Sequence, residues 1–208
     1  MRLPALLART SAAAVLALSI FTTIEAAGAA SGRATAAAAV VDTARVRIDN
    51  FGRISPAYYR GAQPEGRDYA DLAALGVKTV INLTSDDALA EEPGMVEEAG
   101  MNYVSLPMTT RVEPTSEQLA RFLTIVNDPA HQPVYVHCVG GKHRTGVMTA
   151  VYRMTQESWT ADQAFREMKR FNVGPDFLHP EFKKFVYGYR APATPPQAPV
   201  VTVANTQG

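Results

Sequence analysis

The sequence lacks several features by which common protein classes are recognised. Lys+Arg and Asp+Glu balance at 20 each in 208 residues, so the formal net charge is zero. General nucleic-acid and membrane-surface binders carry a broad basic excess, and we therefore expect no nucleic-acid partner and only local binding of anions. The few histidines, among them His131 and His179, form no cluster of ligand-type residues, so the sequence predicts no metal site.

Long apolar runs are missing too. Arg2 and Arg9 precede the run SAAAVLALSIF, which falls short of the ~20 residues needed to span a membrane, and small residues follow it. This pattern predicts a secretory signal peptide over residues 1–30, cleaved after Ala29 or Ala30, and export to the periplasm or the extracellular space. The alternative is an uncleaved anchor, the one case in which we expect an association with a membrane.

Beyond this leader, the composition divides the chain into three parts. Residues 31–44 are predicted to be an Ala-rich linker and residues 191–208 a disordered Pro/Ala-rich tail. Residues 45–190 alternate β-rich runs such as VKTVINL with helical patterns, for which Thr115 and Thr160 are the expected N-caps. We therefore expect one compact, monomeric α/β domain with a central, mainly parallel sheet flanked by helices.

Cysteine is scarce, and the single one stands where such a fold binds its ligands. Open α/β sheets bind at the carboxyl ends of their strands, and Cys138 ends the β-rich run QPVYVHC. Exported proteins commonly use cysteines in pairs, as disulfides, whereas Cys138 has no partner. An unpaired thiol in an oxidising compartment is either buried and inert or kept for its chemistry.

The residues after Cys138 can form an anion-binding nest. Gly140 and Gly141 allow a tight turn in which successive backbone N–H groups point inward, and the helix that follows adds the positive end of its dipole. Such a nest fits a phosphate-sized dianion. The phosphate-binding residues predicted in this way are Val139, Gly140, Gly141, Lys142, His143 and Arg144.

The same surroundings suit nucleophilic catalysis. Cysteines at helix N-termini beside cations are commonly thiolates, and a thiolate beneath a bound phosphate can attack phosphorus. We therefore predict that Cys138 is a nucleophile. Arg144 is predicted to hold two phosphate oxygens with its planar fork, and Thr145 to donate its hydroxyl to the sulfur.

The segment HCVGGKHRTG resembles the HCxxGxxR[ST]G signature of the cysteine-dependent protein tyrosine and dual-specificity phosphatases. The stretches NFGRISPAYYRGAQP, GVKTVINL and WTADQAFREMKRF are similar to the bacterial dual-specificity type and to the plant and fungal atypical group, over residues 47–189. The resemblance implies a phosphatase fold and a phosphatase activity without a metal or organic cofactor. The implied substrates are phosphotyrosine or phosphoserine/threonine proteins, or inositol phosphates, because GKHRTG matches enzymes that act on inositol pyrophosphates.

One part of the family pattern is absent. These phosphatases protonate the leaving oxygen with an Asp on a loop before the cysteine, and the corresponding PMTTRVEPTSEQ contains none. Glu113 is the nearest carboxylate and the first candidate for the general acid, with Asp176 and His143 as alternatives. We expect Asp86 and Asp87 to cap the following helix, and Arg60 to be a structural ion-pair partner on a strand near the site.

The missing Asp favours a rival interpretation, a module of the same fold that binds phosphorylated ligands with weak or no turnover. Cys138 and Arg144 count against it, because a pure binder has no need of a nucleophile that oxidation can destroy. A sulfurtransferase or arsenate-reducing role is a third alternative, and the lack of a second, resolving cysteine argues against the reductase.

Overall fold

The computed structural model describes residues 43–85, 87–175 and 179–193, which belong to one unit of the chain, Val40–Gly208. The expected signal peptide, nearly all of the Ala-rich linker, Asp86, Asp176 and most of the tail lie outside the described residues. The predicted boundaries of those segments therefore stay predictions. In the described part of the chain, no helix is long and apolar enough to cross a membrane.

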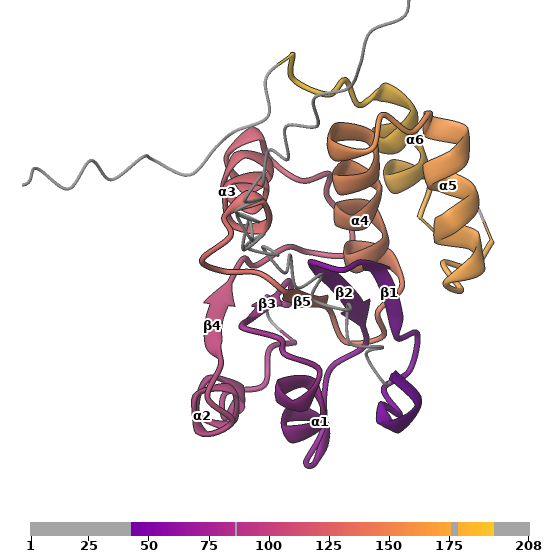
Figure 1. Ribbon diagram of the computed structural model, residues 1–208. Helices are drawn as coiled ribbons and strands as arrows, with labels where there is room; N and C mark the ends of the chain where they lie inside the picture. The colour runs from indigo at the N-terminus through magenta and orange to yellow at the C-terminus, as the bar shows by residue number, and fades with distance from the viewer. Residues whose placement is uncertain (1–42, 86, 176–178, 194–208) are drawn as a thin grey trace, which may run out of the picture. The chain divides into compact units, whose positions relative to one another are not determined.

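A five-stranded sheet with the order β1-β2-β5-β3-β4 forms the centre of the fold (Figure 1). Only β1 is antiparallel to its neighbour, and the other pairings are parallel. This confirms the expected mainly parallel sheet and adds the edge strand β1, which the sequence pattern had not indicated. The strands are β1 (Gly52–Ser55), β2 (Tyr58–Gly61), β3 (Thr79–Asn82), β4 (Asn102–Ser105) and β5 (Val134–His137).

Helices cover both faces of the sheet, as Figure 1 shows. The helices are η1 (Thr43–Arg45), α1 (Asp68–Ala74), α2 (Glu92–Glu98), α3 (Ser116–Asn127), α4 (His143–Gln156), α5 (Ala161–Arg170) and α6 (Pro180–Gly188). Thr115 is the N-cap of α3 and Thr160 is the N-cap of α5, and each forms a capping box with the glutamine three residues later. Both predicted N-caps are confirmed.

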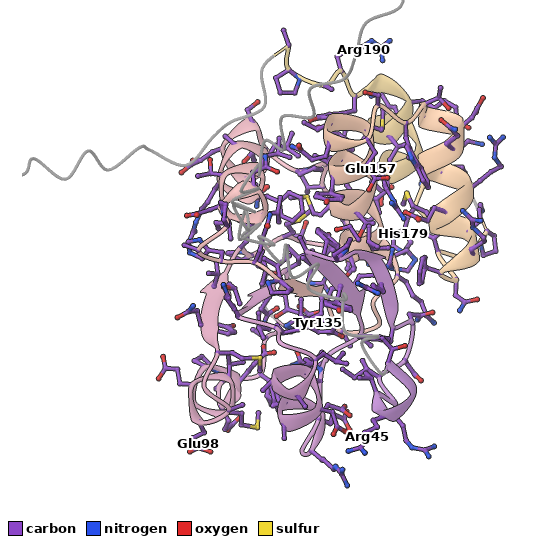
Figure 2. The ribbon with its side chains drawn as sticks, in the orientation of Figure 1. Arg45, Glu98, Tyr135, Glu157, His179 and Arg190 are labelled. Atoms are coloured by element: carbon purple, nitrogen blue, oxygen red, sulfur yellow. The ribbon has the colours of Figure 1, made fainter. Side chains whose placement is uncertain are left out.

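The alternation of side chains along β5 gives each face its own core. On one face, Tyr135 packs with Leu72 of α1 and Val96 of α2. On the other face, Val136 packs with Phe122 of α3, in a core to which α4 also contributes side chains. Figure 2 shows Tyr135 inside the body. All four residues of β5 are buried, which is why this strand reads as a continuous β-rich run.

The strand register brings several strand ends to one edge of the sheet. His137, the last residue of β5, lies opposite Gly61 of β2 and Asn82 of β3. The loops that follow these three strands therefore begin side by side. Cys138 directly follows His137, so the predicted phosphate loop starts at the meeting point of the three strand ends.

Candidate active site

The phosphate loop, residues Cys138–Arg144, runs from the end of β5 into the first turn of α4. Cys138 lies at its base with 3% of its surface exposed, whereas Val139 is 48% exposed. Gly141 has a φ of +61°, and a Cβ at this position would collide with the backbone of Gly61 and Ala62. The loop can therefore pack against the end of β2 only if this residue is glycine.

Three successive carbonyl groups of the loop are held from outside. The N–H of Gln63 donates to Val139 O over 3.0 Å, the Asn50 amide donates to Gly140 O over 2.8 Å, and the Arg60 guanidinium donates to Gly141 O. Because the C=O and N–H of one peptide group point in opposite directions, the N–H groups of the residues that follow these carbonyls face the other way.

These N–H groups, on Gly140, Gly141 and Lys142, meet no acceptor among the residues that the structure describes. They lie ahead of α4, a helix of 14 residues whose N-terminal dipole end adds positive potential. This is the arrangement of an anion-binding nest. The loop has the donors for a phosphate group, as the sequence predicted from its two glycines.

Arg144 lies beside Cys138 and is 3% exposed. Its Nη1 donates to Asp87 Oδ1 over 2.8 Å and its Nη2 to Asp87 Oδ2 over 2.6 Å, while Met108 O accepts from Nη1 over 3.2 Å. The buried Nε has no partner in the described part of the chain. The two terminal nitrogens, which were predicted to hold two phosphate oxygens, thus bind the carboxylate of Asp87 instead, and Nε is the nitrogen without a partner among the described residues.

The pKa values of this pair reflect the contact. Hydrogen bonds from Arg144 lower the pKa of Asp87 to about 2, against a smaller opposing effect of burial. Burial alone would lower the pKa of Arg144, but the hydrogen bond to Asp87 and the contact with Cys138 outweigh it and raise that pKa. Both groups are therefore charged across the physiological pH range.

The role expected for Asp87 was wrong. Helix α2 begins at Glu92, and its N-cap residue Glu91 makes no side-chain capping bond. Asp87 instead turns its carboxylate to Arg144, because the loop after β3 runs past the phosphate loop at the shared edge of the sheet. Asp86 lies outside the described residues.

The other predicted loop residues differ in their surroundings. Thr145 is fully buried, with no hydrogen-bond partner for its Oγ1 among the described residues, and Lys142 is exposed. His143 turns toward the end of the domain that holds α6: its Nε2 lies 2.9 Å from Val173 O, and its ring centroid lies 3.9 Å from that of His179. Burial first, and then His179, lower the pKa of His143. The backbone of His143 belongs to the nest, but its imidazole is engaged elsewhere.

Glu113 lies exposed on the loop between β4 and α3 and makes no hydrogen bond or salt bridge with any described residue. The same loop reaches the site through Met108, whose carbonyl binds Arg144. The structure thus attaches the loop to the site but leaves the carboxylate of Glu113 unengaged. The alternative donor Asp176 lies outside the described residues.

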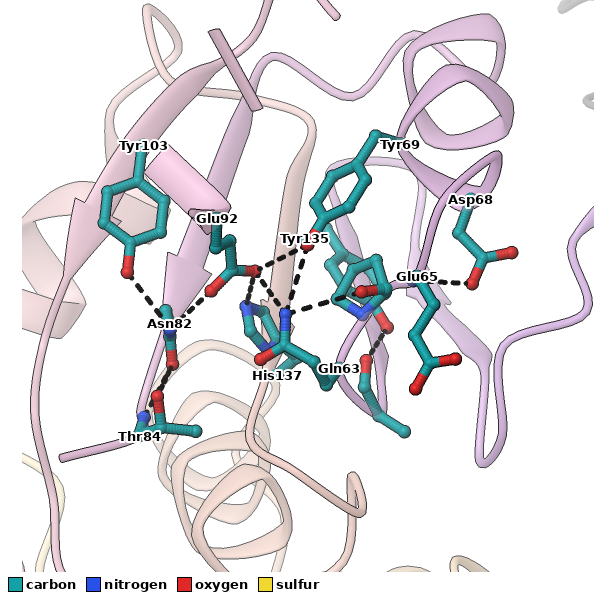
Figure 3. A network of polar contacts seen from close by, with 12 residues as sticks. Gln63, Glu65, Asp68, Tyr69, Asn82, Thr84, Glu92, Tyr103, Tyr135 and His137 are labelled. Atoms are coloured by element: carbon teal, nitrogen blue, oxygen red, sulfur yellow. Dashed lines mark hydrogen bonds and ion pairs between the residues drawn. The ribbon is translucent and has the colours of Figure 1, made fainter. Parts of the chain in front are cut away.

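A buried polar network lies behind the phosphate loop, on the α1 and α2 side of the sheet (Figure 3). Its centre is Glu92, which is fully buried and accepts from the amides of Gln63, at 2.7 Å, and Asn82. His137 Nε2 lies 2.9 Å from Glu92 Oε1, a close approach without the alignment of a hydrogen bond, and the hydroxyl of Tyr69 lies at 3.5 Å. Gln63 also binds Val139 O, so the network supports the loop from behind.

Three residues of this site were not predicted from the sequence: Asn50, Asp87 and Glu92. Asp87 could have been found, because it follows β3, whose carboxyl end meets that of β5 in any parallel pairing of the two. Glu92 carried a weaker signal: His137, in an otherwise apolar strand, needs a polar partner. Asn50 had none, because it reaches Gly140 across 90 residues of sequence.

A cavity of about 560 Å³ opens beside the loop. Its polar lining is mainly acidic, with Arg47 as its one basic residue among the described ones. Within the ranges that the structure describes, no group of three or more His, Cys, Asp or Glu side chains is arranged to hold a metal ion. The lining residues include Val139 and Leu89, and the acidic ones Asp49, Glu65, Asp68 and Asp87.

The family model described as "DSP-PTPase phosphatase fused to NAD+ Kinase" matches residues 37–182. The chain belongs to this dual-specificity phosphatase family. The matched range of this DSP-PTPase chain contains the whole sheet, the phosphate loop and the Asp87–Arg144 pair. The resemblance in the sequence and the expected phosphatase fold are thereby confirmed.

Two of the curated relatives are named for different substrates. The DSP-PTPase chain is 33% identical over 127 residues to the dual specificity protein phosphatase TpbA of Pseudomonas aeruginosa, covering 61% of this chain and 56% of TpbA. It is 28% identical over 137 residues to the inositol diphosphatase SIW14 of Saccharomyces cerevisiae, covering 64% and 48%. The chain therefore spans about half the length of these curated relatives.

Solved structures of both relatives share the fold. The core catalytic domain of SIW14, in complex with citrate, superposes with a TM-score of 0.60 at 26% identity, over 69% of this chain and 86% of that domain. TpbA with a cysteine-to-serine substitution, in complex with pTyr, gives 0.58 at 28% identity, over 67% and 83%. The DSP-PTPase chain thus has the compact fold of both.

Proposed function

We propose that this chain hydrolyses phosphomonoesters through a phosphocysteine intermediate, with Cys138 as the nucleophile and Arg144 as the phosphate clamp. One observation carries the proposal: the thiol of Cys138 lies at the base of a nest, beside Arg144, and neither the N–H groups of the nest nor Nε of Arg144 has an acceptor among the described residues. A phosphate dianion satisfies these donors together. Its phosphorus then lies above the sulfur.

In the first step, the thiolate sulfur of Cys138 donates an electron pair to phosphorus, and the bond between phosphorus and the ester oxygen breaks. The departing oxygen takes the bonding pair and a proton from the general acid. The N–H groups of the loop and Nε of Arg144 hold the equatorial oxygens as charge spreads over them. The donation from Thr145 to the sulfur stays a prediction, because its buried hydroxyl makes no hydrogen bond to any described residue, Cys138 included.

In the second step, a water oxygen forms a bond to phosphorus while the bond between sulfur and phosphorus breaks, and the electron pair returns to Cys138 as thiolate. The water proton goes to the conjugate base of the general acid, and inorganic phosphate leaves. Neither step changes an oxidation state, so the reaction needs no oxidant and no reductant.

We propose Glu113 as the general acid. Its carboxylate is exposed and unengaged within the described residues, and its loop contacts Arg144 through Met108; the proposal requires this loop to bring Glu113 over the nest. Glu113→Gln should slow the hydrolysis of alkyl phosphates, whose leaving group needs the proton, far more than that of p-nitrophenyl phosphate. Equal effects on both substrates, or none, would count against Glu113. Glu117→Gln, which removes an exposed carboxylate in the first turn of α3, is the control for the loss of a charge near the loop.

Two substrate classes follow from the relatives: TpbA is named a dual specificity protein phosphatase and SIW14 an inositol diphosphatase. The cavity beside the loop favours the first class. Asp49, Glu65 and Asp68 line it against one Arg47, and their carboxylates repel the additional phosphates of an inositol diphosphate. An aromatic ring with flanking neutral or basic peptide groups has no such conflict. We therefore propose phosphotyrosine proteins as the main substrates and inositol phosphates as the second class.

The experiment compares phosphate release from a phosphotyrosine peptide and from inositol hexakisphosphate, by wild type and by Cys138→Ser purified in the same way. We expect the wild type to act on the peptide in preference and the variant to act on neither. Faster release from the inositol phosphate would reverse the substrate order. If wild type releases no phosphate but still binds the peptide, the chain is a phosphate-binding module of the same fold.

We also propose that the chain is exported and that its leader is removed. The support is the charged, apolar and small-residue order of residues 1–30. Expression of the full chain in a bacterium, followed by intact mass measurement of the protein outside the cytoplasm, tests it. We expect the mass of a chain that begins at Ala30 or Ser31. Full-length protein confined to the cytoplasm would contradict export.

A further inference from the structure

Arg60 is a cation buried directly beneath the phosphate loop. It lies on β2, pairs with Val136 of β5 through the backbone, and has 0% of its surface exposed. Tyr58, on the same face of β2, packs in the core that includes α4. The side chain of Arg60 therefore lies between the sheet and the helix that opens the phosphate site.

The contacts of Arg60 are few for a buried guanidinium. Nη2 donates to Gly141 O, and the guanidinium carbon lies 4.0 Å from the ring centroid of Phe171. Gly52 leaves room for this ring, because a Cβ there would lie 2.6 Å from it. Nε and Nη1 of Arg60 have no hydrogen-bond partner among the described residues. A buried guanidinium usually has most of its five N–H groups satisfied.

The charge of Arg60 is also uncompensated within the described residues, where it forms no salt bridge. The expected role as a structural ion-pair partner was therefore wrong. Arg153, on α4, shows what such a partner looks like: its guanidinium lies 2.6 Å from Glu157 and 2.7 Å from Glu167. Burial lowers the pKa of Arg60, and Tyr58, Glu167 and Cys138 oppose this effect. Of these, Cys138 belongs to the phosphate site.

Burying an unpaired cation is unfavourable unless an anion completes its surroundings. The site supplies two such anions during the proposed reaction, the thiolate of Cys138 and the phosphate dianion held by the loop. Gly141 O links Arg60 to this loop, because the N–H of the same peptide group, on Lys142, faces the nest on the other side. The free energy of burying the charge is thus recovered when an anion binds.

We infer that Arg60 is a positioning residue of the phosphate site. It fixes the carbonyl of Gly141 from below, and its buried positive charge is balanced by the thiolate and the bound phosphate. The inference rests on the proposed function, because it needs the loop to bind a phosphate group. Arg60 touches no substrate. It acts through the loop and through its field, which the dry surroundings leave unscreened.

The test measures the affinity of three proteins for tungstate, a tetrahedral dianion that resembles phosphate, by calorimetry: wild type, Arg60→Met and Arg60→Lys. Arg60→Met removes the charge at similar volume, and we expect tungstate to bind about 10- to 100-fold more weakly, with a parallel loss in kcat/KM on p-nitrophenyl phosphate. Arg60→Lys keeps the charge and should retain most of the affinity. In ligand-free protein, the melting temperature of Arg60→Met should change little, because removing an unpaired buried charge offsets the lost contact with Gly141.

Alkylation of Cys138 by iodoacetamide gives a second readout that a merely structural role would not move. At a fixed neutral pH, alkylation should be slower in Arg60→Met than in wild type and should stay near the wild-type rate in Arg60→Lys, because the buried positive charge stabilises the attacking thiolate. Arg153→Met is the matched control: it removes an arginine that has carboxylate partners, so it should lower the melting temperature and leave both tungstate affinity and alkylation unchanged.

Two results would overturn the inference alone, and a third would overturn the proposed function with it. If Arg60→Met lowers the melting temperature but binds tungstate as tightly as wild type, Arg60 is merely structural. If Arg60→Lys loses as much affinity as Arg60→Met, the charge is not what matters. If wild type itself binds no tungstate, the loop is not a phosphate site, and the proposed function fails along with the role of Arg60.

Discussion

The buried polar side chains on the two sides of strand β5 differ in how many partners the protein gives them. On the α1 and α2 side, Glu92 is buried among Gln63, Asn82, Tyr69 and His137. On the α4 side, Arg60 is buried with one carbonyl and an aromatic ring. A buried ion with several partners is part of the scaffold, because the protein itself completes its surroundings. A buried ion that has few protein partners and lies next to a nest obtains its remaining partner from a ligand.

Arg144 shows both conditions within one side chain. Its terminal nitrogens are held by Asp87 and Met108, as a structural arginine would be, while its Nε has no partner among the described residues. The fixed part sets the orientation of the free part. Substitutions on the two sides of β5 should therefore separate effects on stability from effects on anion binding and turnover.

The largest effect is expected from Arg144→Lys. A lysine keeps the charge but cannot bind Asp87 in a bidentate manner and also direct a second donor into the nest, so kcat on p-nitrophenyl phosphate should fall by about 10³-fold. Steady-state kinetics measure this loss. Arg153→Lys on the same helix is the matched control and should change kcat little. A loss of less than about tenfold for Arg144→Lys would contradict the clamp.

The next effect is on stability and concerns the opposite side of β5. Glu92→Leu leaves the amides of Gln63 and Asn82 without their buried acceptor, and the free energy of unfolding should fall by about 3 kcal/mol. Urea unfolding, followed by circular dichroism, measures it. Arg60→Met should lose much less. Equal losses for the two variants would break the comparison between the two sides.

A smaller effect is expected where the carboxylate is half-exposed. Asp87→Asn keeps the shape of the contact with Arg144 but removes its charge, and kcat/KM should fall by about tenfold as the guanidinium becomes less well oriented. Asp71→Asn is the control, because Asp71 pairs with the exposed Arg67 away from the loop. If the two variants behave alike, Asp87 does not position Arg144.

The smallest effect is a dependence of stability on pH. The pKa of Asp87 is lowered from an ordinary 3.8 to about 2 in the folded chain, so its ion pair contributes stability that is fully present above about pH 4 and is lost as the pH falls through about 2. The melting temperature of wild type should therefore exceed that of Asp87→Asn by a constant amount at neutral pH, and the difference should shrink between about pH 4 and pH 2. A difference that stays constant over that interval would show that Arg144 does not hold this carboxylate ionised.

Much of the fold could be predicted from local patterns. Thr115 and Thr160 cap their helices as expected, because a capping box needs only residues that are neighbours in the chain. The buried strands β3 and β5 were recognisable from their β-branched and aromatic residues. Strand β1 was not, because four residues with a bulge against β2 carry too little periodicity.

In the candidate site, too, some features follow from local sequence and others from long-range contacts. The sequence by itself determined the tight turn after β5 and indicated the candidate nucleophile and the candidate clamp, because Cys138, Gly141 and Arg144 belong to one continuous loop whose chemistry depends on local spacing. Only the tertiary structure decided which groups hold this loop: Asp87 on Arg144, Glu92 behind His137, and beneath Gly141 the guanidinium of Arg60, which forms no salt bridge with the described residues. These contacts join segments far apart in the chain, and they depend on strand order and register, which no local pattern specifies.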